Sequence, residues 1–184
     1  RCYGTGENWD QPGDYVPGWK LLDRDIGLSA ILLNCNALIN IPVLKAHGES
    51  GLTFAMKNHY GTFDRPWDFH NSAMRFAIPD LNALPPIRDR ARLVIGDVLT
   101  ACTEPRPSSP YWTQDIVGDS ILMSFDPVAH DTVGLQLLTQ LGKRSGERFL
   151  AAEHLANFWL QNAADLGLGT NDLESIELVE VNLG

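Results

Sequence analysis

Residues 37–61 read ALINIPVLKAHGESGLTFAMKNHYG, and this stretch decides the fold. Its first part continues an apolar run that begins at residue 30 and shows no polar alternation. Strands that are buried on both faces have this composition, and they are typical of parallel sheets covered by helices. The stretch therefore predicts an α/β fold, with a mostly parallel or mixed sheet and helices on both of its faces.

Outward from this stretch, apolar runs and helix signals predict further elements of the same fold. Strands are expected at residues 91–96, 120–124 and 176–181. Helices are expected at residues 50–58, 127–141 and 146–162. Residues 1–20 are rich in turn signals and are expected to form an irregular lead-in. The whole chain, residues 1–184, is predicted to be a single domain.

The composition excludes several classes of partner. A chain of 184 residues with 44% hydrophobic and 20% charged residues has the composition of a globular protein. Its net charge of −9 would repel a phosphate backbone or an anionic membrane surface, so nucleic-acid binding is not predicted. No segment approaches the ~20 consecutive apolar residues of a membrane span.

The three cysteines, Cys2, Cys35 and Cys102, lie far apart and form no C-x-x-C pair. They are too few to hold an iron–sulfur cluster in the usual four-cysteine manner, so no cofactor is expected to be held by this chain alone. The sparse, odd count favours a reducing compartment such as the cytoplasm, while export with one disulfide stays open. Because the chain opens at Arg1 without methionine, we expect a trimmed or processed product.

The strongest functional pattern begins where the first buried strand ends. That strand would deliver Lys45 and His47 to its end, and Gly48 and Gly51 would let the backbone approach a ligand closely. A helix that starts at about residue 50 would offer free amides and a partial positive charge to an anion. The pattern therefore predicts an anion-binding site.

Polar residues of the expected helix could extend this site. Ser50, Thr53 and Lys57 recur at helical spacing and would share one side, next to Asn58. Such a set suits a phosphate or carboxylate group, with Lys45, His47 and Lys57 as the catalytic candidates. Neither the nucleotide P-loop order nor the dinucleotide glycine pattern is present. The alternative is that the lysines are solvated and the histidine is an ordinary loop residue.

Two aspartates follow other predicted strands and could join the ligand-binding residues. Asp97 ends the strand at residues 91–96, although capping a turn would also explain it. Asp126 follows residues 120–124, where N-cap duty explains it equally well. His47, His70 and His130 with these aspartates match no compact ligand spacing, so no metal site is predicted.

Several motifs in order along the chain resemble one family, the domain of unknown function 362. The similar segments are residues 39–47, 51–53, 57–61, 77–82, 124–129 with Asp131, and 166–169. The resemblance implies association with iron–sulfur modules in many members and export in some, and it implies no established reaction. The chain lacks the cluster-binding cysteines and the N-terminal part of the usual domain, so we expect an N-terminally incomplete copy.

These observations leave three hypotheses. The first is an enzyme, or half of one, that binds a small anionic ligand, with Lys45 and Lys57 neutralising charge and His47 transferring protons. The second is a non-catalytic module that docks to an iron–sulfur protein partner of a redox system. The third is a purely structural role, in which the polar groups are caps and solvated ends.

Overall fold

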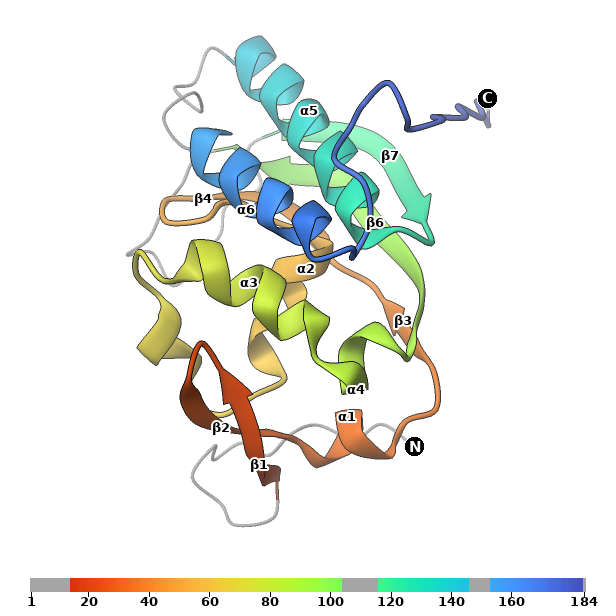
Figure 1. The fold of residues 1–184 in the computed structure, drawn as a ribbon. Helices are drawn as coiled ribbons and strands as arrows, with labels where there is room; N and C mark the ends of the chain where they lie inside the picture. Colours follow the sequence, from red (N-terminus) through yellow and green to blue (C-terminus); the bar gives the residue numbers. More distant parts are fainter. Residues whose placement is uncertain (1–13, 104–115, 146–152, 184) are drawn as a thin grey trace.

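The computed structural model describes residues 14–103, 116–145 and 153–183 (Figure 1). Its strands are β1 (Tyr15–Leu21), β2 (Arg24–Ser29), β3 (Leu38–Asn40), β4 (Val43–His47), β5 (Gly51–Thr53), β6 (Ala91–Cys102) and β7 (Ile116–Ser124). Its helices are α1 (Ala30–Asn34), α2 (Ala55–Asn58), α3 (Met74–Ala83), α4 (Pro85–Arg88), α5 (Pro127–Ser145) and α6 (Glu153–Asp165). Two 3-10 turns, η1 (His59–Gly61) and η2 (Pro66–Phe69), follow α2.

A mixed five-stranded sheet is built around β6, the longest strand. The consecutive strands β3 and β4 both pair with β6 in parallel, β3 near its start and β4 toward its end. β7 pairs antiparallel with β6, and β5 pairs antiparallel with β4. β1 and β2 form a separate antiparallel hairpin. The predicted α/β class with a mixed sheet is confirmed.

The two faces of the five-stranded sheet differ. Helices α5 and α6 lie over one face (Figure 1). Contact there is close: a Cβ added at Gly96 of β6 would lie 2.3 Å from Cζ of Phe54 and 2.5 Å from Nε2 of His130 on α5. The opposite face carries exposed apolar side chains, namely Ile39, Val43, Ile121 and Met123. The described helices therefore cover one face of the sheet, whereas the sequence had led us to expect helices on both faces.

The apolar run at residues 30–44 is divided among three elements rather than forming one strand. Residues 30–34 form α1, and the two short strands β3 and β4 follow it. Pro42 separates the two strands, because proline has no N–H to donate to a sheet. Its carbonyl instead accepts a hydrogen bond of 2.8 Å from the amide of Asp97.

The structure contradicts three other predictions of secondary structure. Residues 15–21 form strand β1, so the irregular lead-in ends earlier than expected, and residues 1–13 lie outside the described part. Residues 176–181 form no strand, because alternation alone does not make one and these residues pair with no strand in the described ranges. The expected helix at residues 50–58 is a hairpin strand followed by a single helical turn.

Two long helices match the prediction more closely. The helix that was expected at residues 127–141 is α5, and residues 146–152 of the next one lie outside the described part, before α6. Between these helices and the sheet lies the core, whose largest fully buried side chains include Trp159, Phe54 and Leu44. Among the described residues, no helix is long and apolar enough to cross a membrane.

Candidate functional site

The hairpin of β4 and β5 places three polar side chains on one face. Lys45 pairs with Thr53 and His47 pairs with Gly51, and paired residues of an antiparallel ladder share a face. Leu44 and Ala46 are fully buried on the helix-covered side, so Lys45 and His47 project from the opposite side. Strand alternation thus brings Lys45, His47 and Thr53 together.

The turn of this hairpin fixes the ring of His47. Its Nδ1 atom accepts hydrogen bonds from the amides of Glu49, at 3.2 Å, and Ser50, at 3.3 Å. In the neutral ring the proton therefore resides on Nε2. The Ser50 hydroxyl donates to the carbonyl of Leu52, at 2.8 Å, and Gly48 is exposed in the turn. Ser50 and Gly48 thus shape the hairpin.

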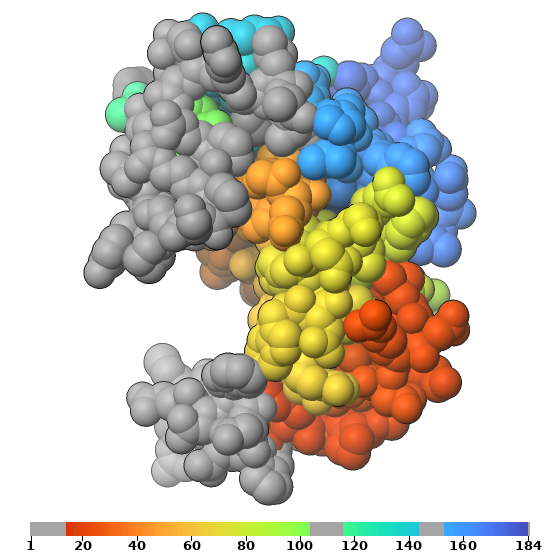
Figure 2. Space-filling model, turned by 90° about the vertical axis from the view of Figure 1, so that its left-hand side faces the viewer, coloured from red at the N-terminus to blue at the C-terminus, as the bar shows by residue number. Residues whose placement is uncertain are grey.

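The segment after the hairpin completes a cluster of titratable groups. The Nζ atom of Lys57 lies 5.5 Å from the ring centroid of Tyr60. The ring of His70 lies 5.2 Å from that of Tyr60 and 6.1 Å from that of His47. We use the term lysine cluster for Lys45, His47, Glu49, Thr53, Lys57, Tyr60 and His70. Figure 2 shows the orange hairpin and the yellow segment that follows it adjoining on one surface.

Positive charge and burial oppose each other in the lysine cluster. Burial, reinforced by the charge of Lys45 and countered by Glu49, lowers the pKa of Lys57 to about 8. Burial and then the charges of Lys57, His70 and Lys45 lower the pKa of His47 to about 3. Burial also lowers the pKa of Lys45, while Cys102 acts in the opposite direction. The cluster therefore holds a positive potential that a bound anion would relieve.

Two hydroxyls in the cluster have unused hydrogen-bonding capacity. The Tyr60 hydroxyl and Oγ1 of Thr53 are buried and find no hydrogen-bond partner among the residues that the structure describes. Burial, with a smaller contribution from Glu49, raises the pKa of Tyr60, so the phenol remains a donor at neutral pH. Leaving a buried polar group unsatisfied costs about 1–3 kcal/mol. A ligand oxygen that accepts from these hydroxyls would offset that cost.

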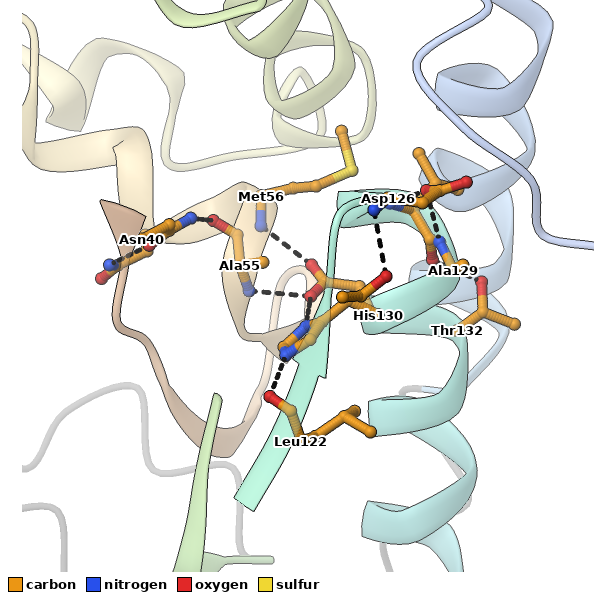
Figure 3. A network of polar contacts seen from close by, with 12 residues as sticks. Asn40, Ala55, Met56, Leu122, Asp126, Ala129, His130 and Thr132 are labelled. Atoms are coloured by element: carbon orange, nitrogen blue, oxygen red, sulfur yellow. Dashed lines mark hydrogen bonds and ion pairs between the residues drawn. The ribbon is translucent and has the colours of Figure 1, made fainter. Parts of the chain in front are cut away.

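The prediction that free amides at a helix start bind the anion was wrong. A carboxylate of the chain itself already occupies the start of α2. Asp131 on α5 accepts from the amide of Ala55, at 2.7 Å, and from that of Met56, at 2.9 Å (Figure 3). The same carboxylate contacts Nδ1 of His130, at 3.1 Å. The ammonium and imidazole groups of the cluster, rather than free helix amides, are thus what the structure offers to an anion.

The two aspartates that were expected to follow strands have capping contacts and no described contact with the lysine cluster. Asp97 lies within β6, which continues to Cys102, and its Oδ1 accepts from the amide of Leu99, at 2.9 Å. Asp126 accepts from the amides of Val128 and Ala129, both at 2.8 Å, and from that of Thr170, at 2.9 Å. Asp126 therefore joins the start of α5 to the C-terminal segment.

Comparison with known proteins identifies the family. The model of the domain of unknown function DUF362 matches residues 8–136. The chain belongs to the DUF362 family. The matched range contains the whole lysine cluster and Asp131. No curated protein and no solved structure matches the chain.

The motifs by which this DUF362 chain resembles its family converge on α2. The side-chain amide of Asn40 donates to the carbonyl of Ala55, at 2.7 Å, and that of Asn82 donates to the carbonyl of Met56, at 2.9 Å. Asp131 holds the amides of the same two residues. Asn58, a predicted ligand-binding residue, is exposed and donates to Oδ1 of Asn40, at 2.7 Å. These contacts fix the turn that carries Lys57.

Sequence reasoning included Tyr60, Asn82 and Asp131 only as parts of family motifs and gave none of them a role in the site. The nearest available signal for Asn82 was a polar residue on an otherwise apolar helix face, which predicts a buried hydrogen bond. No spacing rule could have joined Asp131 to Ala55, which lies 76 residues away. Among the described residues, no group of three or more His, Cys, Asp or Glu could hold a metal ion.

The pKa of Lys57 predicts how stability varies with pH. Between the folded pKa of about 8 and the ordinary value of 10.5, the unfolded chain binds a proton that the folded chain lacks. The free energy of unfolding should therefore rise with pH across this window, by at most about 1.4 kcal/mol per pH unit. Lys57→Met should flatten the rise, as measured by urea unfolding at several pH values.

Two neighbours of Lys57 also contribute to the pH dependence of stability, so they limit the pH range over which its effect can be measured. Lys45 contributes in the same direction, because its pKa is also lowered. Tyr60 acts oppositely above pH 10, since the unfolded chain loses the phenol proton first. The matched control is Lys143→Met, which removes an exposed lysine of α5 and should leave the wild-type slope intact. An unchanged slope in Lys57→Met would contradict the expected protonation state.

Proposed function

We propose that the chain is an enzyme, or half of one, that binds a small anionic compound in the lysine cluster. The observation that carries the proposal is the convergence of Lys45, His47 and Lys57 beside two buried hydroxyls that find no partner within the described part of the chain. Burial of like charges is unfavourable unless an opposite charge accompanies them. Among the described residues, Lys57 makes no ion pair with a carboxylate. Glu49 is exposed and counters these charges only in part, so a phosphate or carboxylate ligand would supply the remaining negative charge.

The structure suggests how each group would contact such a ligand. Lys45 and Lys57 would form charge-assisted hydrogen bonds with its oxygens. His47 is neutral at pH 7, so it would donate a hydrogen bond from Nε2 rather than act as a cation. The phenol of Tyr60 and the hydroxyl of Thr53 would donate to further oxygens. Gly51, with a φ of 76°, keeps the strand opposite His47 free of a side chain.

Titration calorimetry with inorganic phosphate and with small carboxylates tests this proposal. Wild type should bind at least one of these ligands, and Lys57→Met should weaken the affinity by about tenfold or more. An anion raises the pKa of Lys57, so binding at about pH 8.5 should take up protons, seen as a heat that depends on the buffer.

A control and a contrary result complete the test. Lys143→Met preserves the cluster and should bind as wild type does. The proposal fails if no ligand binds, or if Lys57→Met and Lys45→Met bind as tightly as wild type. Added salt should weaken binding, because the contacts are ionic.

A non-catalytic module that docks to an iron–sulfur protein is the second candidate. The exposed apolar face of the sheet favours it, because Ile39, Val43, Ile121 and Met123 lie together on the face that also carries Lys45. Exposed apolar surface of this kind marks interaction sites. Co-purification with a cluster-containing protein, lost in Ile121→Lys but retained in Lys57→Met, would favour docking over ligand binding.

A further inference from the structure

The two lysines of the cluster occupy different environments. Only 7% of Lys57 is exposed, and its Nζ faces the ring of Tyr60. Lys45 is half-buried, and Cys102 favours its charged form. Lys45 therefore keeps its proton more readily, while Lys57 is closer to the uncharged amine. Only the uncharged amine has the lone pair that a nucleophile needs.

We propose that Lys57 is a nucleophilic amine that forms a Schiff base with a small 2-oxo acid, whose carboxylate Lys45 holds. This inference rests on the proposed anion site and names its substrate class. Desolvation beside a second cationic group is a recognised way to activate a lysine amine. Lys57 has both features, since it is buried and feels the charge of Lys45. Of the four lysines in the chain, the exposed Lys20 and Lys143 have neither burial nor a described lysine neighbour.

The substrate class follows from the placement of the two lysines, because the charge of Lys45 reaches Lys57 and lowers its pKa, and Lys45 shares one face of the hairpin with Thr53. A 2-oxo acid carries its carboxylate on the carbon next to the carbonyl, so one lysine can hold the first group while the other attacks the second. The partnerless hydroxyls of Tyr60 and Thr53 can donate to the carbonyl oxygen as negative charge develops on it. Donors aimed at a developing oxyanion contribute to catalysis even when they make few contacts beforehand.

The chemical step balances without an added oxidant or reductant. The Nζ lone pair of Lys57 forms a bond to the carbonyl carbon, and the proton lost from nitrogen moves to the carbonyl oxygen, which gives a carbinolamine. The C–O bond then breaks, and the hydroxyl leaves as water with one proton from solvent. The product is a protonated imine, which withdraws electrons from the neighbouring carbon. Hydrolysis of the imine restores the amine.

Reductive trapping tests the inference directly. Wild type is incubated with pyruvate and sodium cyanoborohydride, and the labelled lysine is located by peptide mass spectrometry. We expect the label on Lys57, and we expect little on Lys20 or Lys143. The labelling rate should rise with pH and reach half of its maximum at about pH 8, as the amine of Lys57 loses its proton. Lys57→Met, which adds no charge at this buried position, should lose the label, and its circular dichroism at the labelling temperature should show that it is folded.

A second substrate separates the roles of the two lysines. Acetone has the carbonyl of pyruvate but no carboxylate, so Lys45 should not assist its binding. In Lys45→Met, the ratio of pyruvate to acetone labelling should fall about tenfold, because a charge-assisted hydrogen bond is lost. Using the ratio removes the effect of Lys45 on the protonation of Lys57. An unchanged ratio would overturn the role of Lys45.

The remaining outcomes distinguish this inference from the proposed function. If pyruvate binds in calorimetry but leaves no label on Lys57, the nucleophile is wrong and the anion site stands. If pyruvate labels Lys20, Lys143 and Lys57 at similar rates, Lys57 has no special reactivity and the inference is again wrong. If neither phosphate nor any carboxylate binds, the proposed function fails and the inference fails with it.

Discussion

Asp131→Ala should lower the free energy of unfolding by about 3–5 kcal/mol, among the largest effects expected of any single substitution in this chain. The carboxylate is fully buried and accepts hydrogen bonds from the amides of Ala55 and Met56. Alanine would leave both amides buried without this partner and would remove the contact of Nδ1 of His130, whose Nε2 would keep its contact with the carbonyl of Leu122. Urea unfolding of wild type and variant measures the difference.

Two further variants make that expectation specific. Asp131→Asn retains one acceptor oxygen but presents an NH2 group toward the same amides, so it should be intermediate. Glu180→Ala removes an exposed carboxylate of the C-terminal segment and should leave the unfolding midpoint unchanged. If Asp131→Ala unfolded at the wild-type urea concentration, Asp131 would not be the group that holds the start of α2.

The contacts of Asp131 also explain why α2 can consist of a single turn. A helical segment of four residues is not stable by its own hydrogen bonds, because nucleation costs more than one turn returns. Here Asp131, Asn40 and Asn82 hold the backbone groups of Ala55 and Met56 from three distant parts of the chain. The family-like motifs thus stabilise the segment that presents Lys57 and Tyr60.

Local signals accounted for the elements that were predicted well. Asp126 and Pro127 mark the start of α5 because an N-cap carboxylate and a proline at the first helical position act within one turn. Residues 91–96 and 120–124 were recognisable by branched apolar side chains, and both lie within the strands β6 and β7. These signals depend only on residues that are close in sequence, so the sequence was sufficient to predict these elements.

The residues from Ser50 to Asn58 show where local reasoning fails. Spacings of three and four residues fit a helix, yet Gly51–Thr53 pairs with β4 and only Ala55–Asn58 turns helically. The deciding interactions are non-local, since the indole of Trp159 and the carboxylate of Asp131 contact this segment from more than 70 residues away. The spacing of residues within one segment contains no information about partners that are distant in sequence.

The reason that was expected for the grouping of Lys45, His47 and Lys57 was wrong. Lys45, His47 and Lys57 were expected to meet at the amides of a helix start, whereas strand pairing and burial bring them together. Their sharing of one region therefore does not depend on a helix dipole. Tyr60 was not expected in the cluster, and His70 was only a possible site residue because the sequence of its loop gives no geometry.

Trp159→Ala should lower the free energy of unfolding by about 3–5 kcal/mol, the usual cost of truncating a large buried aromatic side chain. The indole of Trp159 is fully buried on α6, and its Nε1 donates to the carbonyl of Ser50, at 2.8 Å. That carbonyl belongs to the turn that also donates amides to His47. Trp159 therefore supports the hairpin that carries the lysine cluster.

Trp159→Phe separates packing from this hydrogen bond. Phenylalanine keeps most of the apolar contact but cannot donate, so it should cost less than alanine while leaving the Ser50 carbonyl buried without that donor. If Trp159 positions the hairpin, Trp159→Phe should also weaken anion binding, whereas a core substitution away from the hairpin, such as Leu81→Ala, should reduce stability alone. Equal ligand affinities in Trp159→Phe and wild type would assign Trp159 to packing only. Affinity lost together with amide protection at Gly51 and Leu52 would instead show that α6 stabilises the arrangement of Lys45 and His47.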